Sequence, residues 1–351
     1  MGMVRDNLIL NLFSPVQQMK DTFGSTNSLK GFAICAVLIN HYLNLNIKGH
    51  YLWFASLFVS LFFIVSGYGI YCSLDRSGIA NKLRFKNLLH FYFNRLIRIY
   101  PLFIIAYLIQ CLILGTPILS WALWGIHAPG HFWFIPAIIQ CSLLAPLLFI
   151  LIKRYRFLSL NIIVIIFIVG NLLLNYGILP SEIAKDLRFI HLHWRDVYFL
   201  YLLLFALSMF LPQCLNSWEE IPSYEKKYYF ILLLAIVLTI MIVFKYQDNT
   251  YYLYSLFRKT ICPLVILCVA AVYLLSNRLR FPLLAWIGKT SYPIYLFHIV
   301  IYKSIDRVSG LGKNSLMEGL IVIVTIPLFF YLCTFIDKWN NKITDTIKLK
   351  W

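Results

Sequence analysis

Apolar residues along this chain are gathered into long runs. About ten of these runs are long enough for a helix that crosses a lipid bilayer, which needs roughly 20 mostly apolar residues. They lie near residues 29–46, 52–73, 100–118, 133–152, 158–178, 197–212, 228–245, 258–276, 283–303 and 315–336. Helices are expected because backbone exposed to lipid must satisfy its own hydrogen bonds. The pattern therefore predicts an all-α, polytopic integral membrane protein.

The distribution of Lys and Arg predicts how these spans are oriented. With the N-terminus in the cytoplasm, 21 of the 31 Lys and Arg residues fall on the cytoplasmic side and 10 on the other side. Cytoplasmic loops carry such an excess, so we expect both termini in the cytoplasm. The expected parts are a cytoplasmic N-terminal segment at 1–28, a membrane domain at 29–336 and a cytoplasmic tail at 337–351. The basic, aromatic-rich stretch 75–99 is expected to form an amphipathic helix on the cytoplasmic membrane surface.

The composition narrows the possible partners. Hydrophobic residues make up 61% of the chain and charged residues only 13%, whereas a soluble domain is nearer half apolar and a quarter charged. The net charge of +17 is carried mostly by short loops between apolar runs, which indicates anionic lipid of the bilayer and not nucleic acid. The cysteines show no metal-ligand spacing, so no metal site is expected.

One apolar run carries polar residues in an unusual arrangement. Lys30 and His41 are 11 residues apart in the first run. On an α-helix this spacing is about 16.5 Å of rise and about three turns, so both side chains project from nearly the same face. Asn44 adds polar surface beside His41. Ionisable residues inside a span are costly and mark functional sites by default, so this face is expected to line a cavity. The alternative is hydrogen bonding to neighbouring helices.

Other polar groups lie near the third, fourth and ninth runs. Arg95 and Arg98 are spaced i, i+3, so they share a helical face where two guanidinium groups suit phosphate. An ordinary anchor to lipid headgroups is the alternative for this pair. Further candidates, each of which also suits a simple packing or interfacial role, are His131, Trp133, Tyr292, Tyr295 and His298.

In order along the chain, these segments resemble the motifs of the membrane-bound acyltransferase family 3. The matching segments are Lys30-x10-His41, Leu61 to Gly67, Arg95-x-x-Arg98-Ile-x-Pro101, His131-x-Trp133-Phe and Ser291-Tyr-Pro-x-Tyr295-Leu-x-His298. The family usually has D-x-L-R-G where this chain has Asn27 and Lys30, and lysine keeps the charge but not the planar fork of arginine. We expect the stand-alone form, without the esterase-like domain fused to some members.

The resemblance implies an O-acyltransferase, specifically an O-acetyltransferase, of the bacterial cytoplasmic (inner) membrane. Its partners would be a cytoplasmic acyl-CoA donor such as acetyl-CoA and a hydroxyl of a cell-surface or lipid-linked glycan, with no bound cofactor. His41 would be the general base, because histidine titrates near the operating pH. Lys30, Arg95 and Arg98 would bind the donor. Candidates for acceptor binding or oxyanion stabilisation would be Asn44, His131, Trp133, Tyr292, Tyr295 and His298.

Two other classes of protein also fit polar groups inside membrane spans. The main alternative is a transporter or flippase for a lipid-linked sugar or another polar solute, for which a cationic cytoplasmic face would attract an anionic substrate. A non-catalytic membrane partner of a polysaccharide synthesis complex is the third. The residues leave open the acceptor glycan and the choice between acetyl, succinyl and other acyl groups.

Overall fold

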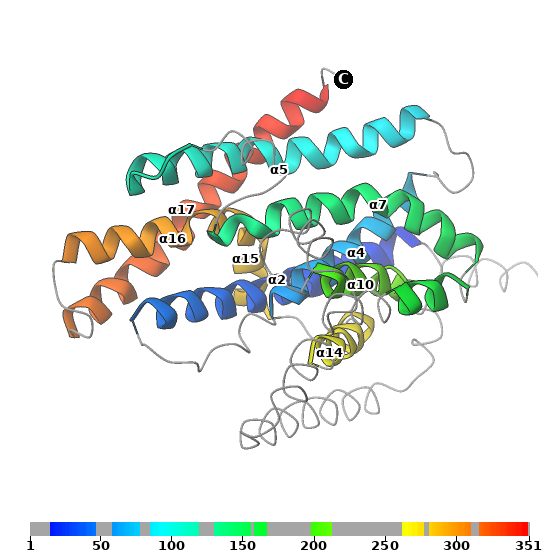
Figure 1. The fold of residues 1–351 in the computed structure, drawn as a ribbon, viewed down its shortest axis with the longest axis horizontal. Coiled ribbons are helices and arrows are strands. Elements are labelled where there is room, and N and C mark those ends of the chain that lie inside the picture. Colours follow the sequence, from blue (N-terminus) through cyan, green and yellow to red (C-terminus); the bar gives the residue numbers. More distant parts are fainter. Residues whose placement is uncertain are drawn as a thin grey trace, which may run out of the picture.

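The structure of the protein is a computed structural model that describes part of the chain. The described residues are 15–46, 58–77, 85–118, 130–155, 158–166, 198–212, 262–276, 281–309 and 316–349. None of them lies in a β-strand, which confirms the all-α prediction for this part of the chain. The helices in Figure 1 are α2 (Pro15–Asn46), α4 (Val59–Arg76), α5 (Phe85–Leu114), the 3-10 turn η1 (Gly130–Trp133), α7 (Phe134–Arg154), α10 (Tyr198–Ser208), α14 (Cys262–Ser276), α15 (Pro282–Lys289), α16 (Ser291–Ser309) and α17 (Leu316–Leu349).

Several helices extend beyond the apolar runs that predicted them. α2 begins at Pro15, well before the run that starts at residue 29, and α17 continues to Leu349 through most of the expected tail. The expected surface helix at 75–99 is not a separate element. Residues 85–99 form the first half of α5 instead, and this helix continues without a break through Pro101 into the third apolar run.

Two of the described helices are long and apolar enough to cross a membrane by length and composition. They are Phe85–Leu114 and His131–Arg154. The predicted run at 228–245 and the second half of the run at 158–178 lie outside the described residues. The number of spans and the location of the termini therefore stay predictions.

The ninth apolar run is divided into two helices. α15 ends at Lys289 and α16 begins at Ser291, with Thr290 between them. Pro293 explains the break, because proline has no backbone N–H to donate to the carbonyl four residues earlier. At the junction, the Thr290 hydroxyl donates instead to the Ile287 carbonyl at 3.1 Å. α16 can thus take a direction of its own while staying connected to α15.

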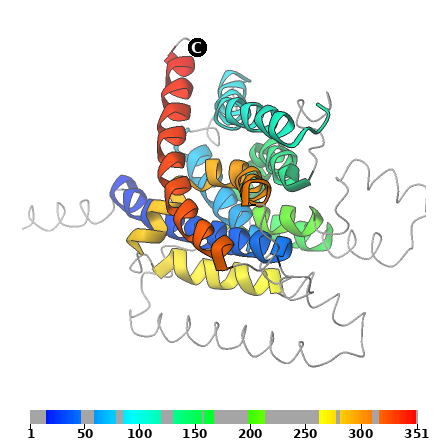
Figure 2. The same cartoon turned by 90° about the vertical axis from the view of Figure 1, so that its left-hand side faces the viewer.

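α4 lies at the centre of the described helices and contacts α2, α7, α10 and α14. Its buried residues include Phe63, Ile64 and Leu74, so it is covered on several faces. Figure 2 shows α14 on one side of α2, with α5 and α7 on the opposite side. α16 contacts α2, α5 and α17. The motif-bearing helices α2, α5 and α16 are therefore neighbours, although they are far apart in sequence.

α15 crosses α2 at a point where both helices carry a glycine. A Cβ atom at Gly31 would overlap the backbone carbonyl of Leu284, and one at Gly288 would overlap that of Asn27. Small residues allow such close approach of helix backbones in membrane proteins. Ser28 adds a polar contact, with its Oγ 3.4 Å from the backbone N of the residue before α15. The crossing fixes α2 against the segment that leads into α16.

Candidate active site

Three histidines from distant parts of the sequence meet in the structure. His41 lies on α2, His131 in η1 and His298 on α16. The ring centroids of His41 and His298 are 4.9 Å apart, and those of His131 and His298 are 5.1 Å apart. His298 is fully buried, His131 is buried and His41 is half-buried. The structure thus joins the first, fourth and fifth family-like motifs in one histidine cluster.

Backbone carbonyl groups of α16 hold two of these rings in place. His298 Nδ1 donates to the Tyr295 carbonyl at 2.6 Å, one turn earlier in the same helix. His131 Nε2 donates to the Leu296 carbonyl at 3.4 Å. These nitrogens must be the donors, because a carbonyl oxygen only accepts. The His41 ring approaches these two rings from α2, and no carbonyl group of α16 is bonded to it in the described part of the chain.

Two tyrosines of α16 brace the histidine cluster. The Tyr295 hydroxyl donates to the backbone carbonyl of His131 and so ties η1 to α16. Tyr302 has its ring 6.1 Å from that of His298 and donates to the Leu38 carbonyl of α2 at 3.2 Å. Tyr302 was missing from the predicted site. Its spacing from Tyr295 and His298 (i, i+3 and i+7) is the helical-face signal that identifies it.

The histidine cluster does not have the geometry of a metal site. Within the described residues, no group of three or more His, Cys, Asp or Glu side chains is arranged to hold a metal ion. Two of the three rings also have one nitrogen committed to a carbonyl oxygen. What the cluster offers is imidazole nitrogens within a buried, aromatic surrounding, which suits proton transfer.

A second polar cluster contains the predicted donor-binding residues. Lys30 of α2 and Arg98 of α5 are near enough to Asp337 of α17 to interact with it electrostatically. Burial raises the pKa of the Asp337 carboxyl, opposed by a hydrogen bond from Asn341 and by the charges of Lys30 and Arg98. Arg98 is exposed and Lys30 is partly buried. We call Lys30, Arg98 and Asp337 the basic cluster. Asp337 was not predicted, because nothing in the local sequence relates it to residues more than 200 positions earlier.

Arg95 and Tyr292 have partners that connect α5 to neighbouring helices. Arg95 donates to the Ser142 hydroxyl of α7 at 3.4 Å, and its Nε atom is buried without a hydrogen-bond partner in the described part of the chain. The Tyr292 hydroxyl donates to the Ile99 carbonyl of α5 at 2.6 Å. Tyr292 therefore contacts the α5 backbone beside Arg98, one turn away from Tyr295 and its contact with His131.

Trp133 contacts a different part of the core from the histidines. Its ring stacks on Tyr201 of α10 at 5.4 Å, and Tyr201 stacks in turn on Phe63 of α4 at 4.5 Å. This contact places the side chain among aromatic residues of the helical core. Asn44 lies on α2, but its side chain is outside the described residues.

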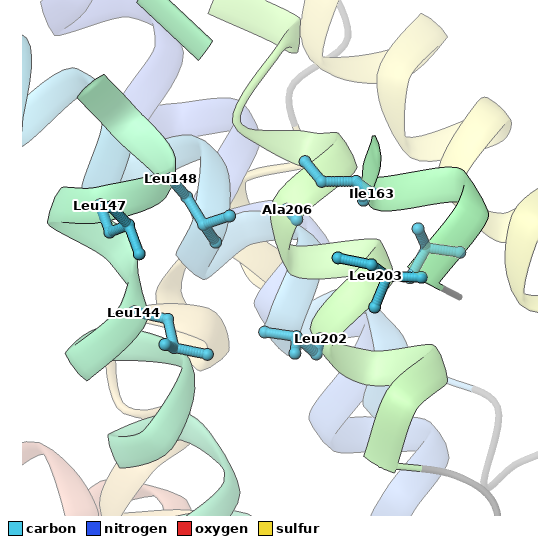
Figure 3. A pocket seen from close by; sticks show the side chains of 8 residues that line it. Leu144, Leu147, Leu148, Ile163, Leu202, Leu203 and Ala206 are labelled. Carbon is cyan, nitrogen blue, oxygen red and sulfur yellow. The ribbon is translucent and has the colours of Figure 1, made fainter. Parts of the chain in front are cut away.

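An apolar pocket of about 170 Å³ lies between α7, the helical residues 158–166 and α10. Figure 3 shows leucine, isoleucine and alanine side chains pointing into it from these segments. Its lining residues are Leu144, Leu147, Leu148, Ile163, Ile166, Leu202, Leu203 and Ala206. No titratable or hydrogen-bonding side chain is among them, so this pocket has no group for acid–base chemistry.

The histidine cluster and the basic cluster lie at different levels of α2. Lys30 and His41 are on one continuous helix, which separates them by about 16.5 Å along its axis. The predicted topology places Lys30, Arg98 and Asp337 next to cytoplasmic ends of spans. It places His41, His131 and His298 toward the opposite ends. The structure groups the same residues together, while the direction of the spans stays a prediction.

Comparison with known proteins identifies the family. No curated protein and no solved structure matches the chain. A family model described as an acyltransferase domain, that of acyltransferase family 3, matches residues 24–337. The matched region includes α2 from before Lys30 and reaches Asp337 in α17. The resemblance found in the motifs is thus confirmed, and the chain belongs to the acyltransferase 3 family.

Proposed function

We propose that this protein is a membrane O-acyltransferase that moves a small acyl group, most simply acetyl, from cytoplasmic acyl-CoA to a hydroxyl of a glycan. The family supports the acyl-transfer chemistry. The apolar helices support a membrane location, and the family resemblance implies the bacterial inner membrane. Family membership favours the enzyme over the transporter or flippase alternative.

The observation that carries the proposal is the meeting of His41 with His131 and His298, about three helical turns from the basic cluster. A sugar hydroxyl is a poor nucleophile near neutral pH and needs a general base. His41 fits this role because its ring is only half-buried, while the other two rings are held by carbonyl groups. Histidine is also the side chain whose ordinary titration range includes neutral pH.

In the proposed step, the acyl group passes directly from sulfur to oxygen. The acceptor hydroxyl gives its proton to His41 while its oxygen attacks the thioester carbonyl carbon. The carbon–sulfur bond then breaks, and the coenzyme A sulfur takes the proton from the His41 imidazolium. The products are the glycan ester and coenzyme A thiol, so His41 returns to its neutral form.

The basic cluster suits the phosphate groups of the donor. Arg98 is exposed and lies near Lys30, so both cations can approach one anionic ligand. Coenzyme A bound there would direct its acyl-bearing arm along α2 toward His41. Arg95 has a smaller share in this proposal, because it already donates to Ser142.

The test compares His41→Ala with His90→Ala, which removes an exposed histidine of α5. Purified full-length variants would be given radiolabelled acetyl-CoA and glycans extracted from cells that lack the protein. We expect acetyl transfer and coenzyme A release from the wild type and His90→Ala, and a loss of about 10²-fold or more for His41→Ala. Acetyl-CoA left intact by the wild type would favour a transporter. Full activity of His41→Ala would refute the assigned base.

A further inference from the structure

His298 has a nitrogen whose role the proposed chemistry does not yet use. The ring is fully buried, and Nε2 has no hydrogen-bond partner among the described residues. Leaving a buried polar atom unpaired is costly, because it loses its bonds to water without gaining others. Such an atom next to a proposed active site therefore indicates a partner that it acquires during the reaction cycle.

The hydrogen bonds of the cluster determine what that partner can be. Because His298 Nδ1 donates to the Tyr295 carbonyl, the neutral ring carries its lone pair on Nε2, which can only accept. The same reasoning applies to His131. Its Nε2 donates to the Leu296 carbonyl, so its Nδ1 in the neutral ring also has a lone pair and no proton to give.

Among the three rings, His41 alone is left to supply a proton to His298 Nε2. The centroid separation of 4.9 Å between these two rings is close to the roughly 5 Å expected for imidazoles joined by an N–H···N hydrogen bond of ordinary length. The planes are inclined at 50°, so the hydrogen bond requires the partly exposed His41 ring to turn toward Nε2. His298 itself is held by the Tyr295 carbonyl and the surrounding core.

We infer that His298 is a positioning residue that accepts a hydrogen bond from His41 and thereby selects the tautomer in which the other His41 nitrogen faces the acceptor hydroxyl. This inference rests on the proposed role of His41 as general base. His298 would also stabilise the His41 imidazolium formed in the step, because Nε2 still accepts when His41 carries its second proton. A neutral imidazole thus serves where a carboxylate orients the base in other enzymes.

The fold gives this arrangement its precision. His41 lies on α2 and His298 on α16. The crossing of α2 with α15, at Gly31 and Gly288, is only a few residues before the start of α16. Tyr302 adds a hydrogen bond from α16 to α2 at Leu38. The two rings are therefore held by rigid elements on both sides, as orientation of a base requires.

The first test uses variants with and without an acceptor at position 298. His298→Gln retains an amide oxygen near the position of Nε2, whereas His298→Leu and His298→Phe do not. With acetyl-CoA and extracted glycan, we expect kcat to fall about 10²-fold in His298→Leu and His298→Phe with little change in the KM for acetyl-CoA. His298→Gln should stay within about 10-fold of the wild type, because its amide oxygen can still accept a hydrogen bond from His41. The larger loss in the other two variants is within the roughly 10²–10⁴-fold that general acid–base catalysis contributes. His90→Ala, which removes an exposed histidine of α5 that is outside the cluster, should stay near wild-type activity.

The second test observes the tautomer of His41 directly and needs no acyl transfer. The full-length protein would be labelled with ¹⁵N at the histidine rings, and the His41 signals would be identified by their loss in His41→Asn. A single His41 tautomer is expected in the wild type and in His298→Gln, with a mixture in His298→Leu and His298→Phe. An unchanged His41 spectrum in all variants would overturn the inference, as would equal activity loss in His298→Gln and His298→Leu. An active His41→Ala would instead refute the role of His41 as base, and acetyl-CoA left intact by the wild type would overturn the proposed function, so these failures are distinguishable.

Discussion

The crossing of α2 and α15 allows a sharp test of how packing supports the active site. In Gly31→Ala, the new methyl group would overlap the Leu284 carbonyl and lie 3.0 Å from the Leu284 Cα. The obstacle is helix backbone, which cannot move aside as a flexible side chain can. Gly69 of α4 is the matched control, because a Cβ there meets nothing within 4 Å.

The expected difference in stability follows from two opposing terms. Replacing glycine by alanine in a helix gains about 1 kcal/mol of helix propensity at either position. Only Gly31→Ala pays for overpacking, typically about 1–3 kcal/mol, and backbone overlap places it at the upper end. The difference between the variants isolates this term at about 3 kcal/mol. With an unfolding entropy of about 2.1 cal/mol/K per residue, a chain of 351 residues shifts by roughly 1.4 °C per kcal/mol, so the expected difference in Tm is about 4 °C.

The same substitution should reduce activity by separating the histidines. α15 leads through Thr290 into α16, so a displacement of α15 from α2 by about 1 Å also shifts His298 relative to His41, and misplacement by that distance can cost about 10²-fold in rate. Thermal unfolding in detergent and acetyl transfer would be measured for wild type, Gly31→Ala, Gly288→Ala and Gly69→Ala. Equal Tm and equal activity of Gly31→Ala and Gly69→Ala would refute the close backbone packing.

Three further predictions concern charged side chains. Arg98→Ala should raise the KM for acetyl-CoA more than Arg95→Ala does, and a flat KM with reduced expression would make the pair topological anchors. Asp337→Asn removes a carboxyl group from beside Lys30 and Arg98, so the KM for acetyl-CoA should fall, and an increase would show that the carboxylate orders these cations. Asp75→Asn breaks the ion pair with Lys153 that joins α4 to α7. The hydrogen bond to Asp75 raises the pKa of Lys153, so the stabilisation, about 0.2–1 kcal/mol for an exposed pair, should be present at neutral pH and be lost as pH rises through that raised pKa. A Tm difference between Asp75→Asn and wild type that persists at that alkaline pH would contradict this reasoning.

The predicted helices and the observed helices agree in type and differ at their ends. Apolar runs are readable because each span must bury its own backbone and face lipid. The junction at Thr290 is encoded locally by Pro293, since the missing N–H acts within one turn. The extension of α2 back to Pro15 and the continuity of α5 through Pro101 have no comparable local signal, because packing against neighbouring helices overrides the propensity of single residues.

The sequence by itself determined the class of protein and most of the candidate residues. Its apolar runs, the Lys30 and His41 spacing and the five ordered motifs identified an acyltransferase-like membrane protein, because periodicity and motif spacing are properties of the chain alone. Only the tertiary structure decided which residues share a site. It brought His131 and His298 to His41, placed Asp337 beside Lys30 and Arg98, and turned Trp133 toward Tyr201. These contacts join residues that are distant in the chain, and they depend on helix crossings such as Gly31 on Gly288, whose geometry arises from packing and not from local sequence.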